Sequence, residues 1–189
     1  MREPGQRKAE TRQRILDAAG PLFRRYGIDG VGVDAIMHEA GLTHGGFYAH
    51  FASKEALAAE VAVADLARSA AKWEAISREP DPAAALARIV EPYLDPAHVA
   101  GVDRGCALPA LGAELARRPE ACASLAEPIR TMLAALQRCR PEDGAPGAMV
   151  RLSCMVGAVL LARLSRDPTL AAALLEAAKK SISAFVRPG

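Results

Sequence analysis

Residues 33–54, VDAIMHEAGLTHGGFYAHFASK, place the strongest constraint on how this chain folds. Their apolar residues recur at helical spacing as far as Ala40, and Gly41 is the kind of residue that ends a helix. Thr43 is suited to the N-cap of a second, short helix over 44–49, and Ser53 to the N-cap of a third. The stretch therefore predicts a helix, a tight turn, a short helix and the start of a longer one.

A helix, a glycine-containing turn and a short second helix form the helix-turn-helix unit of DNA-binding proteins. Residues 40–54 contain no Asp or Glu, so this surface would not repel an anionic duplex. Gly45 and Gly46 leave room for a backbone to approach a phosphate or a base edge. The competing interpretation is an ordinary helical hairpin, because short patterns of this kind also occur by chance.

The surrounding run, residues 10–57, resembles the DNA-binding domain of TetR-like (TetR/AcrR) transcriptional regulators. The order and spacing of the matching features are intact, and they are Arg14-Ile15-Leu16, Ala18-Ala19, Leu22-Phe23, Gly27, Ile36, Ala40-Gly41, Gly45, Tyr48, His50-Phe51 and Ser53-Lys54-Glu55. The resemblance implies a DNA-binding domain over 10–57, with its helix-turn-helix at about 33–52. The other two thirds of the chain resemble the family only in helical pattern and length.

The same resemblance implies that the short helix enters the major groove of double-stranded DNA. The residues expected at the DNA are Gly32, Val33, Thr43, His44, Gly45, Gly46, Tyr48, His50 and Lys54. Lys54 is expected on a phosphate, whereas Thr43 and His44 are expected to set the sequence preference. Gly32 departs from the family pattern, which often has Ser or Thr there, so one hydroxyl contact to a phosphate is expected to be missing.

The charge of the chain supports only a local nucleic-acid surface. The net charge is +2, which is far from the strongly basic balance of many nucleic-acid-binding proteins. Residues 1–26, however, hold seven Arg or Lys residues against three acidic ones. Any contact with DNA must therefore draw on this N-terminal excess, which would otherwise be a solvated helix face.

Composition points to a globular protein of the cytoplasm. The chain has 189 residues, of which 51% are hydrophobic and 24% charged. Its four cysteines, at 106, 122, 139 and 154, form no C-x-x-C pair, so we expect reduced thiols and no metal or cofactor. The N-terminus is polar, and no 18 consecutive residues are both apolar and uncharged, so we expect no signal peptide and no membrane span.

The pattern predicts an all-α protein of about nine helices, with no strand. We expect a flexible arm over 1–9, the three-helix DNA-binding domain over 10–57, and a helical ligand-binding and dimerisation domain over 58–189. In the last of these, residues 119–139 are expected to form one helix and residues 140–147, RPEDGAPG, a loop.

The last two predicted helices, about 148–165 and 168–186, carry more apolar surface than one side of a small domain can cover. We expect a homodimer in which two copies of each form a four-helix interface, as the resemblance also implies. The alternative is that this surface is simply intramolecular core.

The expected function is a sequence-specific transcriptional regulator, a repressor that a small-molecule effector releases from a palindromic operator. Two alternatives remain open. A DNA-binding protein without any ligand is one; a helical enzyme is the other, although H-E-x-x-H, P-loop, G-x-S-x-G and dinucleotide motifs are all missing from the sequence.

Cys106 is a candidate sensor of electrophiles or oxidants. It precedes a predicted helix start near Pro109, where unpaired N–H groups and the helix dipole would favour a thiolate. Arg104 adds a cation two residues earlier. The alternative is a buried small residue beside a noncovalently bound apolar effector.

Overall fold

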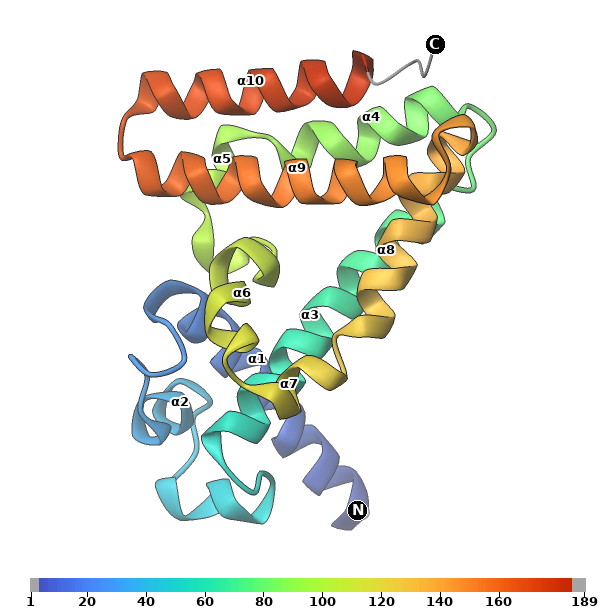
Figure 1. The fold of residues 1–189 in the computed structure, drawn as a ribbon. Coiled ribbons are helices and arrows are strands. Elements are labelled where there is room, and N and C mark those ends of the chain that lie inside the picture. Colours follow the sequence, from blue (N-terminus) through green and yellow to red (C-terminus); the bar gives the residue numbers. More distant parts are fainter. Residues whose placement is uncertain (1–3, 185–189) are drawn as a thin grey trace.

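The structure is a computed structural model that describes residues 4–184, and within them it is entirely helical, which confirms the predicted fold class (Figure 1). In chain order the ten α-helices and three 3-10 helices of these residues are α1 Pro4–Tyr26, α2 Val33–Glu39, η1 His44–Ala49, α3 Lys54–Ile76, α4 Pro82–Tyr93, α5 Pro96–Ala100, η2 Val102–Arg104, α6 Ala107–Ala116, α7 Pro119–Ala123, α8 Ala126–Cys139, η3 Pro141–Asp143, α9 Gly144–Ser165 and α10 Pro168–Ala184.

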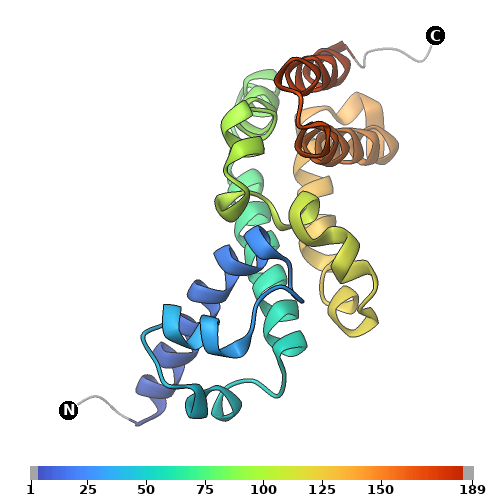
Figure 2. The same ribbon diagram turned by 90° about the vertical axis from the view of Figure 1, so that its left-hand side faces the viewer.

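The helices are arranged between two distinct ends of the molecule. Helices α1 and α2, η1 and the start of α3 gather at one end, which is the lower one in Figure 1. Helices α9 and α10 lie side by side across the other end, with α4 behind them, and the turned view agrees (Figure 2). The long helices α3 and α8 pack against each other and connect the two ends. The predicted DNA-binding and dimerisation surfaces are therefore far apart.

The predicted N-terminal arm is helical in its described part. Helix α1 begins at Pro4 rather than at residue 10, and residues 1–3 lie outside the described residues. Proline is favoured at the start of a helix because its fixed φ suits the first turn and its missing N–H has no helical partner there. Gln6, Arg7, Lys8 and Ala9 are all good helix formers, so the helix extends to this proline.

Side-chain caps fix where the connecting helices begin. The Ser53 hydroxyl accepts a hydrogen bond from the Ala56 N–H at 3.1 Å, as its sequence position predicts. The Asp81 carboxylate accepts from the N–H groups of Ala83 and Ala84 and so starts α4.

Two segments differ from the prediction because prolines begin new helices there. Residues 119–139 form two helices, α7 and α8, since Pro128 suits only the first turn of a helix and α8 starts two residues before it. Residues 140–147 are not a loop but η3 and the first turn of α9, which holds Pro146. The chain turns between them at Gly144, whose φ of +61° favours glycine. Helix α9 consequently starts four residues earlier than predicted.

Helix α9 is a core helix with one open side. By length and apolar composition Pro141–Ser165 could cross a membrane, as the central helix of many folded proteins could. Its inner face is buried, however, and it contains Arg151, which is only 1% exposed and pairs with Asp143. Its outer face leaves large apolar side chains in solvent, namely Met149, Val150, Leu160, Leu161 and Leu164. Helix α10 ends its described part at Ala184, so residues 185 and 186 of the predicted helix lie outside the described residues.

Candidate nucleic-acid interface

A small aromatic core holds the helix-turn-helix. Ile36 and Met37 of α2 and Phe47 of η1 are almost completely buried. The Phe47 ring lies 5.8 Å, between centroids, from that of Phe51, which is also buried. These contacts anchor a 3-10 helix of only six residues, which would be unstable in isolation.

The turn between the two helices is fixed from outside by α1. Gly41 has φ of +65°, the left-handed conformation predicted for a glycine that ends a helix. The Arg14 guanidinium donates to the Ala40 carbonyl at 2.6 Å, so a cation satisfies the C-terminal end of α2. Sequence reasoning assigned Arg14 no role, because only the tertiary structure brings α1 against this turn.

The exposed face of η1 holds the residues predicted to meet DNA. Thr43, His44, Gly45 and Tyr48 are exposed, and the Tyr48 ring is 66% exposed although it touches Phe47 edge to face. No atom lies within 4 Å of a Cβ built on Gly45, so the backbone is open to approach there. This face is polar, small and almost uncharged.

One cap in this region does not form. Thr43 occupies the N-cap position of η1, but its hydroxyl makes no capping hydrogen bond, contrary to the prediction. Instead the Thr43 carbonyl accepts from the Gly46 N–H at 3.1 Å, the closer pairing of a 3-10 turn. The Thr43 side chain is therefore not committed to holding the helix.

The fold adds an acidic group that the sequence segment lacks. Asp34 of α2 is strongly exposed, and its carboxylate contacts the Nδ1 of His44. Residues 40–54 contain no carboxylate, but the helix-turn-helix places this one directly beside them. An imidazole paired in this way is held in place, and its partner carries a charge that opposes an approaching phosphate.

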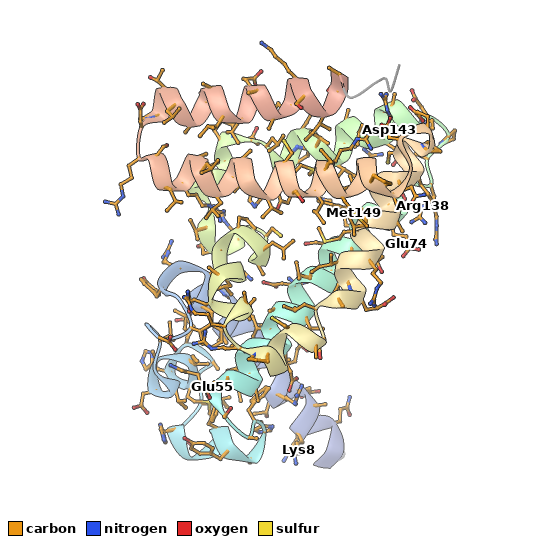
Figure 3. All side chains as sticks on the ribbon, viewed as in Figure 1. Lys8, Glu55, Glu74, Arg138, Asp143 and Met149 are labelled. Atoms are coloured by element: carbon orange, nitrogen blue, oxygen red, sulfur yellow. The ribbon has the colours of Figure 1, made fainter. Side chains whose placement is uncertain are left out.

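The remaining predicted residues are less accessible. Lys54 is partly buried and donates from Nζ to the Val31 carbonyl at 3.0 Å, which leaves two of its three N–H groups for other partners. His50 is partly buried, and its Nδ1 has no hydrogen-bond partner. Gly32 is exposed at the N-cap of α2 without a side-chain cap, and Val33 is partly buried. Figure 3 places Lys8 at the same end of the molecule as Glu55, which begins α3.

Polar contacts tie this end to the rest of the protein. The Arg24 side chain of α1 pairs with Asp65 of α3 and donates through Nε to the Asp103 carbonyl of η2 at 2.8 Å. The Glu114 carboxylate of α6 accepts from the Ile28 N–H at 2.8 Å. The loop that precedes α2 is thus held directly by α6.

Cys106 lies at the N-cap of α6, as predicted, but its chemistry differs from the expectation. Burial raises the pKa of the Cys106 thiol, and the Tyr93 hydroxyl and the Arg163 and Arg24 guanidinium groups offset this only in part. Arg104, the cation expected to help, points into solvent with an 86% exposed side chain. The expected stabilisation of a thiolate is therefore wrong, because desolvation outweighs the helix N-terminus.

The second domain contains several cavities. One of them, of about 510 Å³, lies where α5 meets the α9–α10 turn and has mostly apolar walls, including Val99, Ala162, Ala171 and Leu175. Two smaller cavities, of about 160 and 220 Å³, adjoin Cys106 between α3 and η2. The sequence indicated none of them, since their walls come from segments far apart in the chain.

An all-helical fold with a helix-turn-helix at one end and a polar, open second helix is that of a helix-turn-helix DNA-binding protein. Comparisons with known proteins identify the family. Residues 15–61 match the family described as "Bacterial regulatory proteins, tetR family". The N-terminal region therefore contains a TetR-family domain, which confirms the resemblance seen in the sequence, and the family is described as one of regulatory proteins.

Similarity to curated proteins covers less than a third of this chain. The chain is 42% identical over 52 residues to the A-factor receptor protein of Streptomyces griseus. It is 40% identical over 60 residues to the HTH-type transcriptional regulator AcrR of Shigella flexneri. The matched segments cover 28% and 32% of this chain but only 19% and 28% of those two proteins.

Similarity to solved structures extends over the whole fold. The crystal structure of Escherichia coli NemR in its reduced form has a TM-score of 0.80 at 21% identity, covering 95% of this chain and 98% of that one. A TetR transcriptional regulator from Chloroflexus aurantiacus has a TM-score of 0.75 at 24% identity, covering 95% and 96%. These similarities establish the fold of the second domain and leave its ligand unspecified.

Proposed function

We propose that this protein is a sequence-specific transcriptional regulator that binds double-stranded DNA through η1. The observation that carries the proposal is the open face of η1, where polar side chains are exposed above a buried aromatic core. A short helix enters the major groove when its side chains reach the base edges and its anchoring residues stay in the core. Thr43, His44 and Tyr48 are the candidates for base contacts.

In this proposal the residues around η1 contact the sugar-phosphate backbone of the DNA. Gly45 allows close approach of the main chain, whereas the Cβ position of Gly46 faces the buried Met37. Lys54 shares its ammonium group between the Val31 carbonyl and a phosphate. Gly32 and Val33 meet the backbone at the start of α2. His50 has a buried Nδ1 and acts by positioning η1 rather than by reaching a base.

The protein acts as a homodimer on a palindromic operator. The outer face of α9 exposes a stripe of large apolar residues, and Leu170 of α10 continues it with 49% exposure. Gly157 lies on this helix with no atom near its Cβ position, so a second copy could pack closely there. Two copies of α9 and α10 would form the four-helix interface, which places the two η1 helices on successive half-sites.

Regulation is by a small molecule bound noncovalently in the second domain, which releases the repressor from its operator. The contact of Arg24 with the Asp103 carbonyl of η2, and that of Glu114 of α6 with the Ile28 N–H, are the physical route in this proposal from that domain to the helix-turn-helix. The raised pKa of the Cys106 thiol favours this mechanism over a thiolate sensor. Because the target is operator DNA, we place the protein in the cytoplasm.

The test is selection of DNA sequences from a random duplex library, followed by quantitative binding to the selected site. We expect an inverted repeat, and we expect Lys54→Ala to weaken binding to all sequences and to reduce the slope of log K against log salt by about 0.9. Lys180→Ala, an exposed cation at the far end on α10, is the matched control. A protein that enriches no sequence would refute the proposed function, whereas an unchanged salt slope would refute only the role of Lys54.

A further inference from the structure

The two small cavities beside Cys106 share their walls and lie at the junction of the two domains. We define the junction cavity as the space of about 160 Å³ that Trp73, Ile89 and Tyr93 enclose with Cys106. Its neighbour of about 220 Å³ reaches Arg24 of α1. Ser69, Lys72, Arg104, Gly105 and Cys106 line both.

The charge around the junction cavity is positive and largely uncompensated. Its charged lining residues are Lys72, Arg88 and Arg104, with no carboxylate among the residues that line it. Arg88 is paired with Glu79, whereas Arg104 comes no closer than 4.0 Å to a carboxylate, that of Asp103. Within residues 4–184 the structure gives Lys72 no ion pair. Two cations are therefore available to an anion at the mouth.

The neighbouring cavity of about 220 Å³ does not change this excess of positive charge. Arg24 and Arg68 line it, and both pair with Asp65, which is its one acidic lining residue. Lys72 and Arg104 line this cavity too, so the same two cations stay free at the shared boundary.

The interior of the junction cavity is aromatic and contains an unused donor. Trp73 and Tyr93 are buried and meet edge to face, with ring centroids 5.7 Å apart. Tyr93 is only 7% exposed, and its hydroxyl faces the weakly accepting Cys106 thiol without making a hydrogen bond of good geometry to it. Such a buried hydroxyl is costly unless something accepts from it.

The neighbouring polar groups are already occupied. His98 Nδ1 lies 2.7 Å from the Tyr93 carbonyl, and its Nε2 accepts from the Cys106 N–H at 3.0 Å. This arrangement uses both ring nitrogens of a neutral imidazole, and burial lowers the pKa of His98 accordingly. The free donor inside the cavity is thus the Tyr93 hydroxyl.

We propose that the junction cavity binds a small aromatic carboxylate as the effector. The ring lies against Trp73 and Ile89, the carboxylate pairs with Lys72 and Arg104, and Tyr93 donates to a second oxygen on the ring. This inference deepens the proposed function and rests on it. Arg104 ends η2, whose Asp103 carbonyl is bound by Arg24 of α1, so drawing Arg104 onto a ligand would pull on the DNA-binding domain.

Trp73 is the only tryptophan of the chain and lines this cavity, so its fluorescence reports directly on occupancy. The probes are benzoate, 4-hydroxybenzoate, the neutral benzamide and inorganic phosphate. We expect saturable quenching and a raised melting temperature with both acids, and neither effect with benzamide or phosphate. Absence of binding by both acids, or equal binding by benzamide, would overturn the proposal.

Single-residue variants test whether the aromatic acid binds in the junction cavity. Lys72→Ala and Arg104→Ala, both at exposed residues, should each weaken 4-hydroxybenzoate binding about tenfold, since a charge-assisted hydrogen bond is lost. Tyr93→Phe should reduce the affinity of 4-hydroxybenzoate to that of benzoate. Lys180→Ala is the control for charge. Ala171→Phe fills the cavity of about 510 Å³ and should leave binding unchanged; if it alone abolished binding, the proposed site would be wrong.

Operator binding is measured on the same variants. Release of DNA by 4-hydroxybenzoate in the parent, which in Lys72→Ala needs an about tenfold higher concentration, is the expected result. If the operator is bound but the acid neither binds nor releases it, this inference fails and the proposed function stands. If no DNA sequence is enriched at all, the proposed function is refuted, whatever the acid does.

Discussion

The two ends of this protein both expose side chains to solvent, but the exposed residues differ in kind. At the helix-turn-helix end the open face is polar and small, with a single large ring, Tyr48, in solvent. At the α9–α10 end the open face is apolar, with Leu161 and Leu164 at 51% and 68% exposure. A polar face on a rigid core suits a hydrated, charged duplex, whereas an apolar stripe is stable only when it is covered.

The largest expected effect comes from placing charge on the apolar end. Leu161→Glu with Leu164→Glu should weaken the dimer by about 1,000-fold, because two carboxylates would lose their water in the interface. Sedimentation at micromolar concentration should show a monomer, and operator affinity should fall with it. Ala134→Glu on the exposed side of α8 is the matched control. A double variant that remains dimeric would show that this face is covered in some other way.

A smaller effect is expected from removing the large ring at the polar end. Tyr48→Ala should lower operator affinity about tenfold through the loss of one base or sugar contact, without changing the dimer. Tyr26 is comparably exposed, at 58%, but ends α1 and lies outside η1, so Tyr26→Ala is its control. Equal losses in both variants, measured by fluorescence anisotropy, would argue against η1 as the contact element.

Two hydroxyl residues of the helix-turn-helix region are expected to contribute to different properties, one to folding stability and the other to DNA binding. Ser53→Ala should cost about 1 kcal/mol of unfolding free energy, because its cap on Ala56 is lost. Thr43→Ala should stay within about 0.5 kcal/mol of the parent, since Thr43 makes no capping bond, while it alters operator preference. Chemical denaturation measures the unfolding free energy, and competition binding measures the operator preference. A large loss of stability in Thr43→Ala would mean that its hydroxyl caps η1 in solution.

The smallest expected effect is the contribution of His98 to the pH dependence of folding stability. Burial lowers the pKa of His98 in the folded state, so the unfolded chain takes up this proton first as pH falls. Stability should therefore decrease as pH drops through the ordinary histidine value of about 6.5. In thermal melts His98→Gln should flatten this decrease. An identical pH dependence in the parent and in His98→Gln would contradict the assignment.

The local pattern of residues was sufficient to predict the helix-turn-helix and the all-helical class. Gly41 in the left-handed conformation, Ser53 at an N-cap and Asp81-Pro82 at a helix start all depend on neighbours within a few residues. The family match over residues 15–61 falls where these local signals are densest. Such features are encoded in short segments, so the sequence alone shows them.

The start and end of several helices could not be predicted in the same way. Proline indicates a loop in residues 140–147 and gives no clear break within 119–139, although it is equally suited to the first turn of a helix. Whether a helix begins at such a proline depends on how the next segment packs.

Only the tertiary structure decided the chemistry of the sites. Asp34 beside His44, Arg14 on the Ala40 carbonyl and the Arg24 contact with η2 join residues that local patterns do not relate. Cys106 shows the reason most clearly. Its position at a helix start was visible in the sequence and favoured a thiolate, but burial raises its pKa, because desolvation depends on everything that packs around a group rather than on its neighbours in the chain.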